Sequence, residues 1–100
     1  MDPESSEIMI ADVVVSTAGR DAGKMYYVMG TDDQFLALVN GKDRTLEKPK
    51  RKKCKHTKMV LRSETRVAQK LRDGEKVLSS EIRKDLAYLS RTTQENDLGG

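Results

Sequence analysis

Three strand-like runs, each followed by a glycine-containing turn, lie within residues 10–41 and restrict this chain to few folds. The runs are residues 10–17, which include three consecutive valines, residues 25–29 (MYYVM) and residues 35–39 (FLALV). Valine, tyrosine and phenylalanine favour the half-buried, pleated surface of a sheet. Short strands joined by tight turns predict a meander that curls into a small barrel.

Four turn residues are expected to shape this barrel: Gly19, Gly23, Asn40 and Gly41. Glycine is favoured where the backbone takes a positive φ or passes close to a neighbour. The Asn40–Gly41 pair is the strongest short turn signal in the chain, because both residue types tolerate positive φ. A further turn is predicted at residues 30–34 (GTDDQ), where Asp32 and Asp33 are turn residues and not an acid–base pair.

The remainder of the chain is expected to form one more strand and a helical segment. Residues 56–62 (HTKMVLR) predict a final strand, with Met59 and Leu61 on one face. Ser63 is expected to cap a first helix that carries Val67 and Leu71 and stops at Gly74. Ser79 and Ser80 are expected to cap a second helix, whose apolar stripe comprises Ile82, Leu86 and Leu89.

This pattern predicts a single, mainly β domain with a C-terminal α-helical appendage. The 100 residues are enough for one domain. We expect a disordered N-terminal tail over residues 1–9, the barrel over residues 10–62, the helical appendage over residues 63–90 and a disordered tail over residues 91–100. The helical stripe is expected to pack on the barrel, with a docking face for a protein partner as the alternative.

The charges are distributed unevenly along the chain. Residues 1–41 carry two basic and seven acidic side chains, residues 42–62 carry ten and two, and residues 63–100 carry seven of each. The overall charge of +3 therefore hides one block with a net charge of +8. Such a concentrated positive block predicts contact with a polyanion.

The centre of this block is a run of cations without an intervening acid, which we call the basic strip. It comprises Lys48, Lys50, Arg51, Lys52, Lys53, Lys55 and Lys58. Cations that meet phosphates release counterions, so such a strip predicts salt-dependent binding with little reading of sequence. The alternative is a solvated sheet edge on which lysines prevent pairing with other strands.

The loop GRDAGK at residues 19–24 does not have the spacing of a nucleotide-binding P-loop. That motif places four residues between its first glycine and the GK pair, and a serine or threonine after the lysine. Here three residues separate Gly19 from Gly23, and Met25 follows Lys24. We therefore expect a structural turn whose Arg20 and Lys24 are candidate contacts to a phosphate backbone.

No other feature indicates an enzyme. His56 is the single histidine and has no signalled nucleophile or carboxylate partner, so a capping or RNA-contact role is favoured over catalysis. Cys54 is the single cysteine, which excludes an intramolecular disulfide and a cysteine-based zinc site; an inward-facing side chain is favoured over a reactive thiol. Tyr26 and Tyr27 point to opposite faces of a strand, so one is expected in the core, and the other is a weak candidate for base stacking.

The order of these segments resembles the KOW domain. The quoted features are the valine-rich strand, AGRDAGK at residues 18–24, DDQFLALVNG at residues 32–41, and the basic run that ends in Lys55–His56. The chain is similar to the branch related to the archaeal and eukaryotic large-subunit ribosomal protein L-fourteen-e, and residues 75–86 are similar to small bacterial KOW-domain proteins. The resemblance implies an SH3-like barrel that binds RNA, usually ribosomal RNA, with Gly23 as the loop glycine beside Arg20, Asp21 and Lys24.

Residues and resemblance together predict a non-catalytic RNA-binding protein whose partner is ribosomal RNA or the ribosome. The expected RNA contacts are Arg20, Lys24, Lys48, Lys50, Arg51, Lys52, Lys53, Lys55, His56 and Lys58. The alternative is a protein-interaction adaptor that uses the barrel and the C-terminal helix; attachment to an anionic membrane ranks last, because no lipidation signal adjoins the strip. We expect no cofactor, metal or small-molecule substrate, and a cytoplasmic location.

Overall fold

Five antiparallel strands and two helices make up the fold in the computed structural model, which describes the chain from residue 8 to residue 99 and its side chains up to residue 92. The elements, in chain order, are β1 (Asp12–Ser16), β2 (Met25–Asp32), β3 (Phe35–Val39), β4 (Lys50–Lys53), the 3-10 turn η1 (Cys54–His56), β5 (Thr57–Arg62), α2 (Arg66–Asp73) and α3 (Ser79–Gly99).

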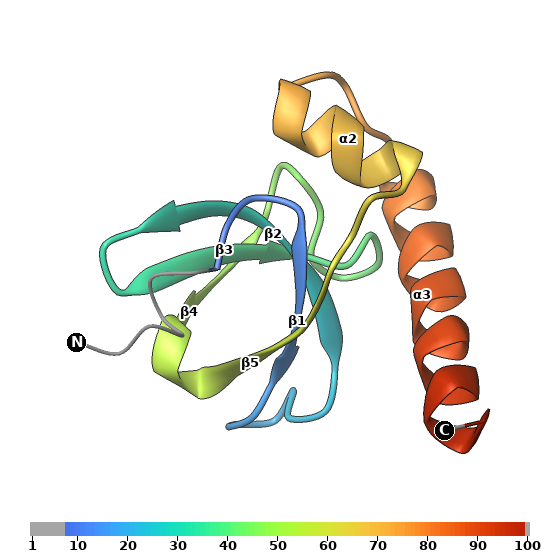
Figure 1. The fold of residues 1–100 in the computed structure, drawn as a ribbon. Helices are drawn as coiled ribbons and strands as arrows, with labels where there is room; N and C mark the ends of the chain where they lie inside the picture. The colour runs from blue at the N-terminus through green and yellow to red at the C-terminus, as the bar shows by residue number, and fades with distance from the viewer. Residues whose placement is uncertain (1–7, 100) are drawn as a thin grey trace.

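The strands form one sheet in the order β4-β3-β2-β1-β5. The sheet curls so that its two edge strands, β4 and β5, follow each other along the chain and are joined by η1 (Figure 1). Within residues 8–99 no hydrogen-bonded ladder connects β4 to β5, so the barrel stays open along this line. The predicted class, a small mainly β barrel followed by a C-terminal helical segment, is confirmed.

The sheet buries a hydrophobic cluster on each of its faces. The inner cluster fills the barrel and includes Val14, Val28 and Leu38. The outer cluster includes Val13 and Val39 of the sheet together with side chains of both helices. Because successive side chains of a strand point to opposite faces, neighbours such as Val13 and Val14 serve different clusters.

The helices cover the outer face of the sheet, as Figure 1 shows for α3 alongside the barrel. Ile82, Leu86 and Leu89 of α3 are all buried in the outer cluster. Val67 packs in the same cluster, and the half-buried Leu71 lies against it. The apolar stripe of α3 is therefore occupied by intramolecular packing and is not an exposed docking face.

Tyr26 and Tyr27 both lie in the core, on opposite faces of β2. Tyr26 belongs to the inner cluster and Tyr27 to the outer one, and each is at most 1% exposed. The expectation that one tyrosine lies in the core is met by both, and the weak candidacy of the other for base stacking does not hold, because helices α2 and α3 bury the face that Tyr27 occupies.

Tyr27 anchors the helices to the sheet through a buried polar network. Its hydroxyl donates to the carboxylate of Asp85 on α3 and lies 2.8 Å from Ser63 Oγ. Thr65 Oγ1 donates to the same carboxylate at 2.7 Å. Burial and the hydrogen bond to Asp85 raise the pKa of Tyr27 to about 12. The phenol is therefore a neutral structural group across the physiological pH range.

Two strands differ from the sequence-based expectation. Residues 50–53 form β4, although a run of lysine and arginine gives no apolar alternation by which to recognise a strand. In β5 the register against β1 shifts between Val13 and Val14, which pair with Leu61 and Met59 respectively. This bulge places Leu61 against the outer cluster and Met59 against the inner one, so the prediction that they share a face was wrong.

The helix ends also differ from those expected. Thr65, and not Ser63, caps α2, and its Oγ1 accepts a hydrogen bond from Ala68 N at 3.2 Å. Gly74 ends this helix in the left-handed conformation, as predicted. Helix α3 continues to Gly99 and so includes residues that were assigned to a disordered tail. Between Ser80 and Asp97 the sequence contains neither proline nor glycine to interrupt a helix.

The expected N-terminal tail lies largely outside the described residues, which begin at residue 8. Ile8 is buried in the inner cluster, so the packed part of the chain starts two residues before the predicted boundary. Asp12 holds this entry segment, because its carboxylate accepts from Met9 N at 2.8 Å and from Arg62 Nε at 2.9 Å.

Candidate functional site

Strand β4 divides the centre of the basic strip into two sets of side chains. Leu36 and Leu38 of β3 are buried, and they pair with Lys52 and Lys50 respectively. The side chains of Lys50 and Lys52 therefore lie on the inner face of the barrel. Arg51 and Lys53 alternate with them and are exposed on the outer face.

The two inward lysines are held by Asp21 of the GRDAGK loop. Lys52 Nζ lies 3.0 Å from Asp21 Oδ1 and donates to the carbonyl oxygen of Ala18 at 2.9 Å. Lys50 Nζ lies 3.7 Å from Asp21 Oδ2. The side chain of Lys52 is only 11% exposed, and that of Lys50 is 25% exposed. These two members of the strip therefore have a structural partner within the chain.

Asp21 accepts two further hydrogen bonds from the barrel interior. Ser16 Oγ donates to its Oδ1 at 3.0 Å, and Tyr26 Oη donates to its Oδ2 at 3.1 Å. Burial alone would raise the pKa of Asp21, but the bonds from Lys52, Ser16 and Tyr26 hold it well below its usual range. Burial and the bond to Asp21 raise the pKa of Tyr26 to about 12. Asp21 is therefore an ionised hub that fastens the GRDAGK loop to β4.

The glycines of this loop allow the turn that brings Asp21 to the barrel. Gly19 and Gly23 have φ values of 85° and 93°, a region that disfavours side chains. Gly23 N donates to Ser16 O at 2.8 Å, and Lys24 N donates to Asp21 O at 2.9 Å. The side chains of Arg20 and Lys24 are exposed. The loop thus buries its acid and leaves its two cations in solvent.

Five cations of the strip remain exposed, and we call them the outward cations: Lys48, Arg51, Lys53, Lys55 and Lys58. Arg51 lies over the ring of Phe35, with its guanidinium carbon 3.9 Å from the ring centroid. None of the five forms an ion pair with any residue between 8 and 92. Strand β4 and η1 lie on the side of the barrel away from α3 (Figure 1).

His56 and Cys54 belong to η1, where the backbone of His56 accepts a hydrogen bond and the side chain of Cys54 packs against the core. The carbonyl oxygen of His56 accepts from Thr17 N at 2.9 Å, and its side chain is half-buried. Cys54 packs against the inner cluster, as the inward-facing interpretation expected. Its backbone N–H donates to Gln34 O at 2.7 Å. The His56 imidazole makes no described contact that indicates catalysis.

A hollow of about 400 Å³ opens where the GRDAGK loop, the loop after β3 and β4 meet, and we call it the mouth. Its cations are Arg20, Lys24, Arg44, Lys50 and Lys52, and its carboxylates are Asp21 and Asp43. Arg44 was not among the predicted contacts. It follows the Asn40–Gly41 turn by a few residues, and only the fold shows that this loop borders the mouth.

The loop after β3 is organised by the side chain of Asn40 and by the shape of Gly41. Asn40 Oδ1 accepts from Lys42 N at 2.9 Å and from Arg44 N at 3.1 Å, and its Nδ2 donates to Asp43. Gly41 has a φ of 78°, and a Cβ atom there would lie 2.3 Å from the carbonyl oxygen of Ser79. Asn40 itself does not take the expected positive φ. The turn thus serves to seat this loop against the start of α3.

The described part of the chain offers neither a metal site nor a membrane span. Among the side chains of residues 8–92 no group of three or more histidine, cysteine or acidic residues is placed to hold a metal ion. Within the same part of the chain, neither helix combines the length and the apolar character needed to cross a bilayer.

The geometry can be set against known proteins. Neither the known protein families nor the curated proteins give a match to this chain. The resemblance to the KOW domain therefore stays a prediction that rests on residues 18–24, residues 32–41 and the basic run that ends at Lys55–His56.

Proposed function

We propose that this protein is a non-catalytic RNA-binding protein, with ribosomal RNA or the ribosome as its ligand, and that it acts in the cytoplasm. The observation that carries the proposal is the set of outward cations, which form no ion pair with residues 8–92, whereas the inward lysines are paired with Asp21. A phosphate backbone is the ligand that such a surface attracts most strongly.

The arrangement on β4 favours this function over simple protection of a sheet edge. Lysines that only block edge pairing need no aromatic support. Here the Arg51 guanidinium lies over the ring of Phe35, a contact that limits its freedom while the side chain stays exposed to solvent. A planar, pre-positioned guanidinium suits a phosphate or a base edge. The charges do not separate RNA from DNA, and the preference for RNA rests on the KOW resemblance.

Binding of a fluorescent ribosomal RNA fragment across a series of salt concentrations tests the proposal. If the five outward cations each meet a phosphate, the logarithm of the association constant falls with the logarithm of the salt concentration with a slope of about −3.5 for single-stranded RNA. An affinity insensitive to salt would contradict the proposal. So would binding that is unchanged when Lys53, Lys55 and Lys58 are replaced by glutamine.

The adaptor alternative has less support from the surface than it had from the sequence. The stripe Ile82, Leu86 and Leu89, which would have served as its docking face, is buried. Purification of the tagged protein from cells separates the two functions. A ribosome-sized complex that nuclease disperses supports RNA binding, whereas a complex that survives nuclease supports an adaptor.

A further inference from the structure

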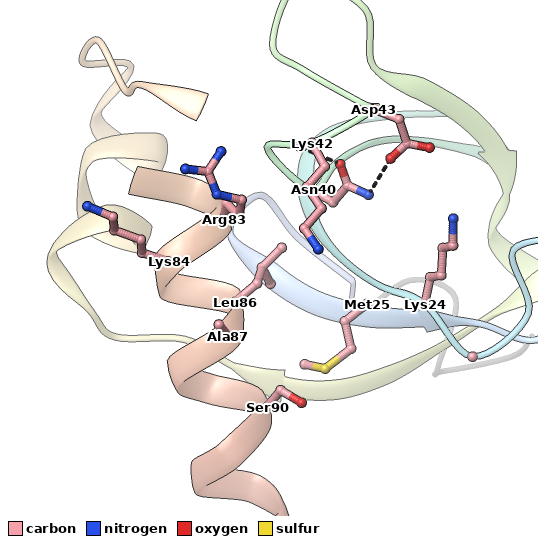
Figure 2. Close-up of a pocket in the computed structure, with 11 residues that line it drawn as sticks. Lys24, Met25, Asn40, Lys42, Asp43, Arg83, Lys84, Leu86, Ala87 and Ser90 are labelled. Atoms are coloured by element: carbon pink, nitrogen blue, oxygen red, sulfur yellow. Dashed lines mark hydrogen bonds between the residues drawn. The ribbon is translucent and has the colours of Figure 1, made fainter. Parts of the chain in front are cut away.

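A second hollow, which we call the α3 groove, lies between the barrel and helix α3 and has a volume of about 590 Å³. Its apolar lining is Met25, Leu86 and Ala87. Figure 2 shows the side chains of Met25 and Leu86 directed into the space between α3 and the barrel. The volume falls within the range of about 300–1,000 Å³ that is typical of small-ligand sites.

The polar residues around this groove are mainly cationic. Lys24 and Lys42 line it from the barrel, and Arg83 and Lys84 from α3. In Figure 2 the Arg83 and Lys84 side chains point away from the barrel, so the cations on the barrel side of the groove are Lys24 and Lys42. Asp43 is the one carboxylate in the lining, and its Oδ1 is occupied by Asn40 Nδ2 at 2.9 Å. The groove therefore complements a ligand with an apolar body and a negative charge.

The α3 groove adjoins the mouth of the barrel. Lys24 and Asp43 line both hollows. The mouth in turn reaches Lys50 and Lys52 on the inner face of β4. Arg20, Lys24 and Arg44 of the mouth therefore extend the cationic surface from the GRDAGK loop toward the groove.

We propose that the α3 groove binds one unpaired nucleotide of the RNA, with its base on Met25 beside Ala87 and its phosphate at Lys24 and Lys42. The inference rests on the proposed function and makes it more specific, because it assigns a preference for single-stranded RNA. Bases removed from their stack are commonly held between aromatic or apolar side chains. The thioether of Met25 is suited to the face or edge of an aromatic ring.

The experiment records methyl spectra of the full chain labelled at the methionine methyl groups. The ligands are a short oligoadenylate and an abasic oligomer with the same number of phosphates. The base-bearing oligomer shifts the methyl resonance of Met25, and the abasic one leaves it in place. Met59, which packs in the inner cluster, serves as the internal control and does not move. We expect the oligoadenylate to bind at least about fivefold more tightly, the lower end of base-stacking effects.

The outcomes separate the inference from the proposed function. If both oligomers bind with salt dependence but neither shifts Met25, or both bind equally well, the nucleotide site is contradicted and the RNA-binding function stands. If neither binds, both are contradicted. An oligoglutamate peptide that shifts Met25 as strongly as the oligoadenylate assigns the groove to an acidic peptide and overturns the nucleotide.

A pair of variants on the exposed face of α3 tests the charge of the groove. Ala87→Glu introduces a carboxylate beside the apolar floor, and Ala87→Gln introduces a side chain of equal size without the charge. Both residue types favour a helix, so the fold is retained. We expect the glutamate variant to lose the preference for oligoadenylate and the glutamine variant to keep more of it. Equal effects of the two variants would contradict a phosphate at Lys24 and Lys42.

Discussion

The two faces of β4 carry the same kind of side chain in two different situations. On the inner face, Lys50 and Lys52 are paired with Asp21 and partly withdrawn from solvent. On the outer face, Arg51 and Lys53 are exposed, and Arg51 rests on Phe35. Two of these four cations therefore stabilise the fold, and the other two belong to a candidate binding surface. Strand alternation decides which residue does which, and neither charge nor composition reveals it.

The largest effect is expected from removing the acid on the inner face. Asp21→Asn leaves two partly buried lysines without their counter-charge, and breaking such a pair costs about 2–4 kcal/mol of the free energy of unfolding. Denaturant unfolding monitored by circular dichroism measures this loss. Asp32→Asn is the matched control, because Asp32 is exposed at the end of β2. Equal stability of the two variants would remove the distinction between the two faces of β4.

The next effect contrasts neighbouring lysines of the same strand. Lys52→Met removes the cation closest to Asp21 and is expected to lower the free energy of unfolding by about 1–3 kcal/mol. Lys53→Met removes an exposed cation and should change it by no more than about 0.5 kcal/mol. The two variants have the same change in charge and volume. A loss at Lys53 as large as that at Lys52 would show that the pairing with Asp21 does not stabilise the fold.

The inner face also predicts a dependence of stability on acid. Because its pKa is held well below the usual value, Asp21 contributes stability above its unfolded pKa of about 3.9, and this is lost as the pH falls toward the folded value. The melting temperature of the wild type should therefore fall as the pH is lowered from about 5 to about 2. Asp21→Asn should show a shallower decline over the same range. Parallel curves would contradict the assignment of the ionised hub.

The smallest effect concerns the aromatic support on the outer face. Phe35→Leu removes the ring beneath Arg51 and keeps a side chain suited to a half-buried position. An exposed cation–π contact is worth about 0.5–1 kcal/mol, so the stability changes little. If the ring positions Arg51 for a phosphate, RNA affinity falls in this variant by about two- to fivefold at constant stability. Unchanged RNA affinity in this variant would show that Phe35 packs against its neighbours but does not position Arg51 for RNA.

Local sequence signals located four of the five strands but neither β4 nor the pairing between distant segments. The run at residues 35–39 coincides with β3, and the run at residues 25–29 is the first part of β2, which continues to Asp32 and so into the turn predicted at residues 30–34. The turn glycines 19 and 23 take the positive φ that such residues allow. These features depend on residues close together in the chain. The bulge in β5 depends on how β5 pairs with β1. The sequence of residues 57–62 alone therefore does not predict that Met59 and Leu61 face opposite sides of the sheet.

The sequence predicted which residues make up the charged segment, but it did not predict how their side chains are arranged in the fold. The sequence-based prediction identified the cations of the basic strip, but it did not distinguish Lys50 and Lys52 from Arg51 and Lys53. The difference arises because the GRDAGK loop brings Asp21 across about thirty residues to β4, a contact that spacing does not reveal. Lys42 and Arg44 were missed because their loop gains its neighbours only when it is seated against α3.

The most direct test of the central claim compares the salt dependence of RNA binding in two double variants of β4. Arg51→Gln/Lys53→Gln removes the outer pair, and Lys50→Gln/Lys52→Gln removes the inner pair; both are measured at a temperature where circular dichroism shows them folded. The outer variant should reduce the magnitude of the slope by about 1.4–1.8, whereas the inner variant should change it by less than about 0.5. Equal reductions in slope, or a larger one for the inner pair, would contradict the division of the basic strip into structural and RNA-binding halves.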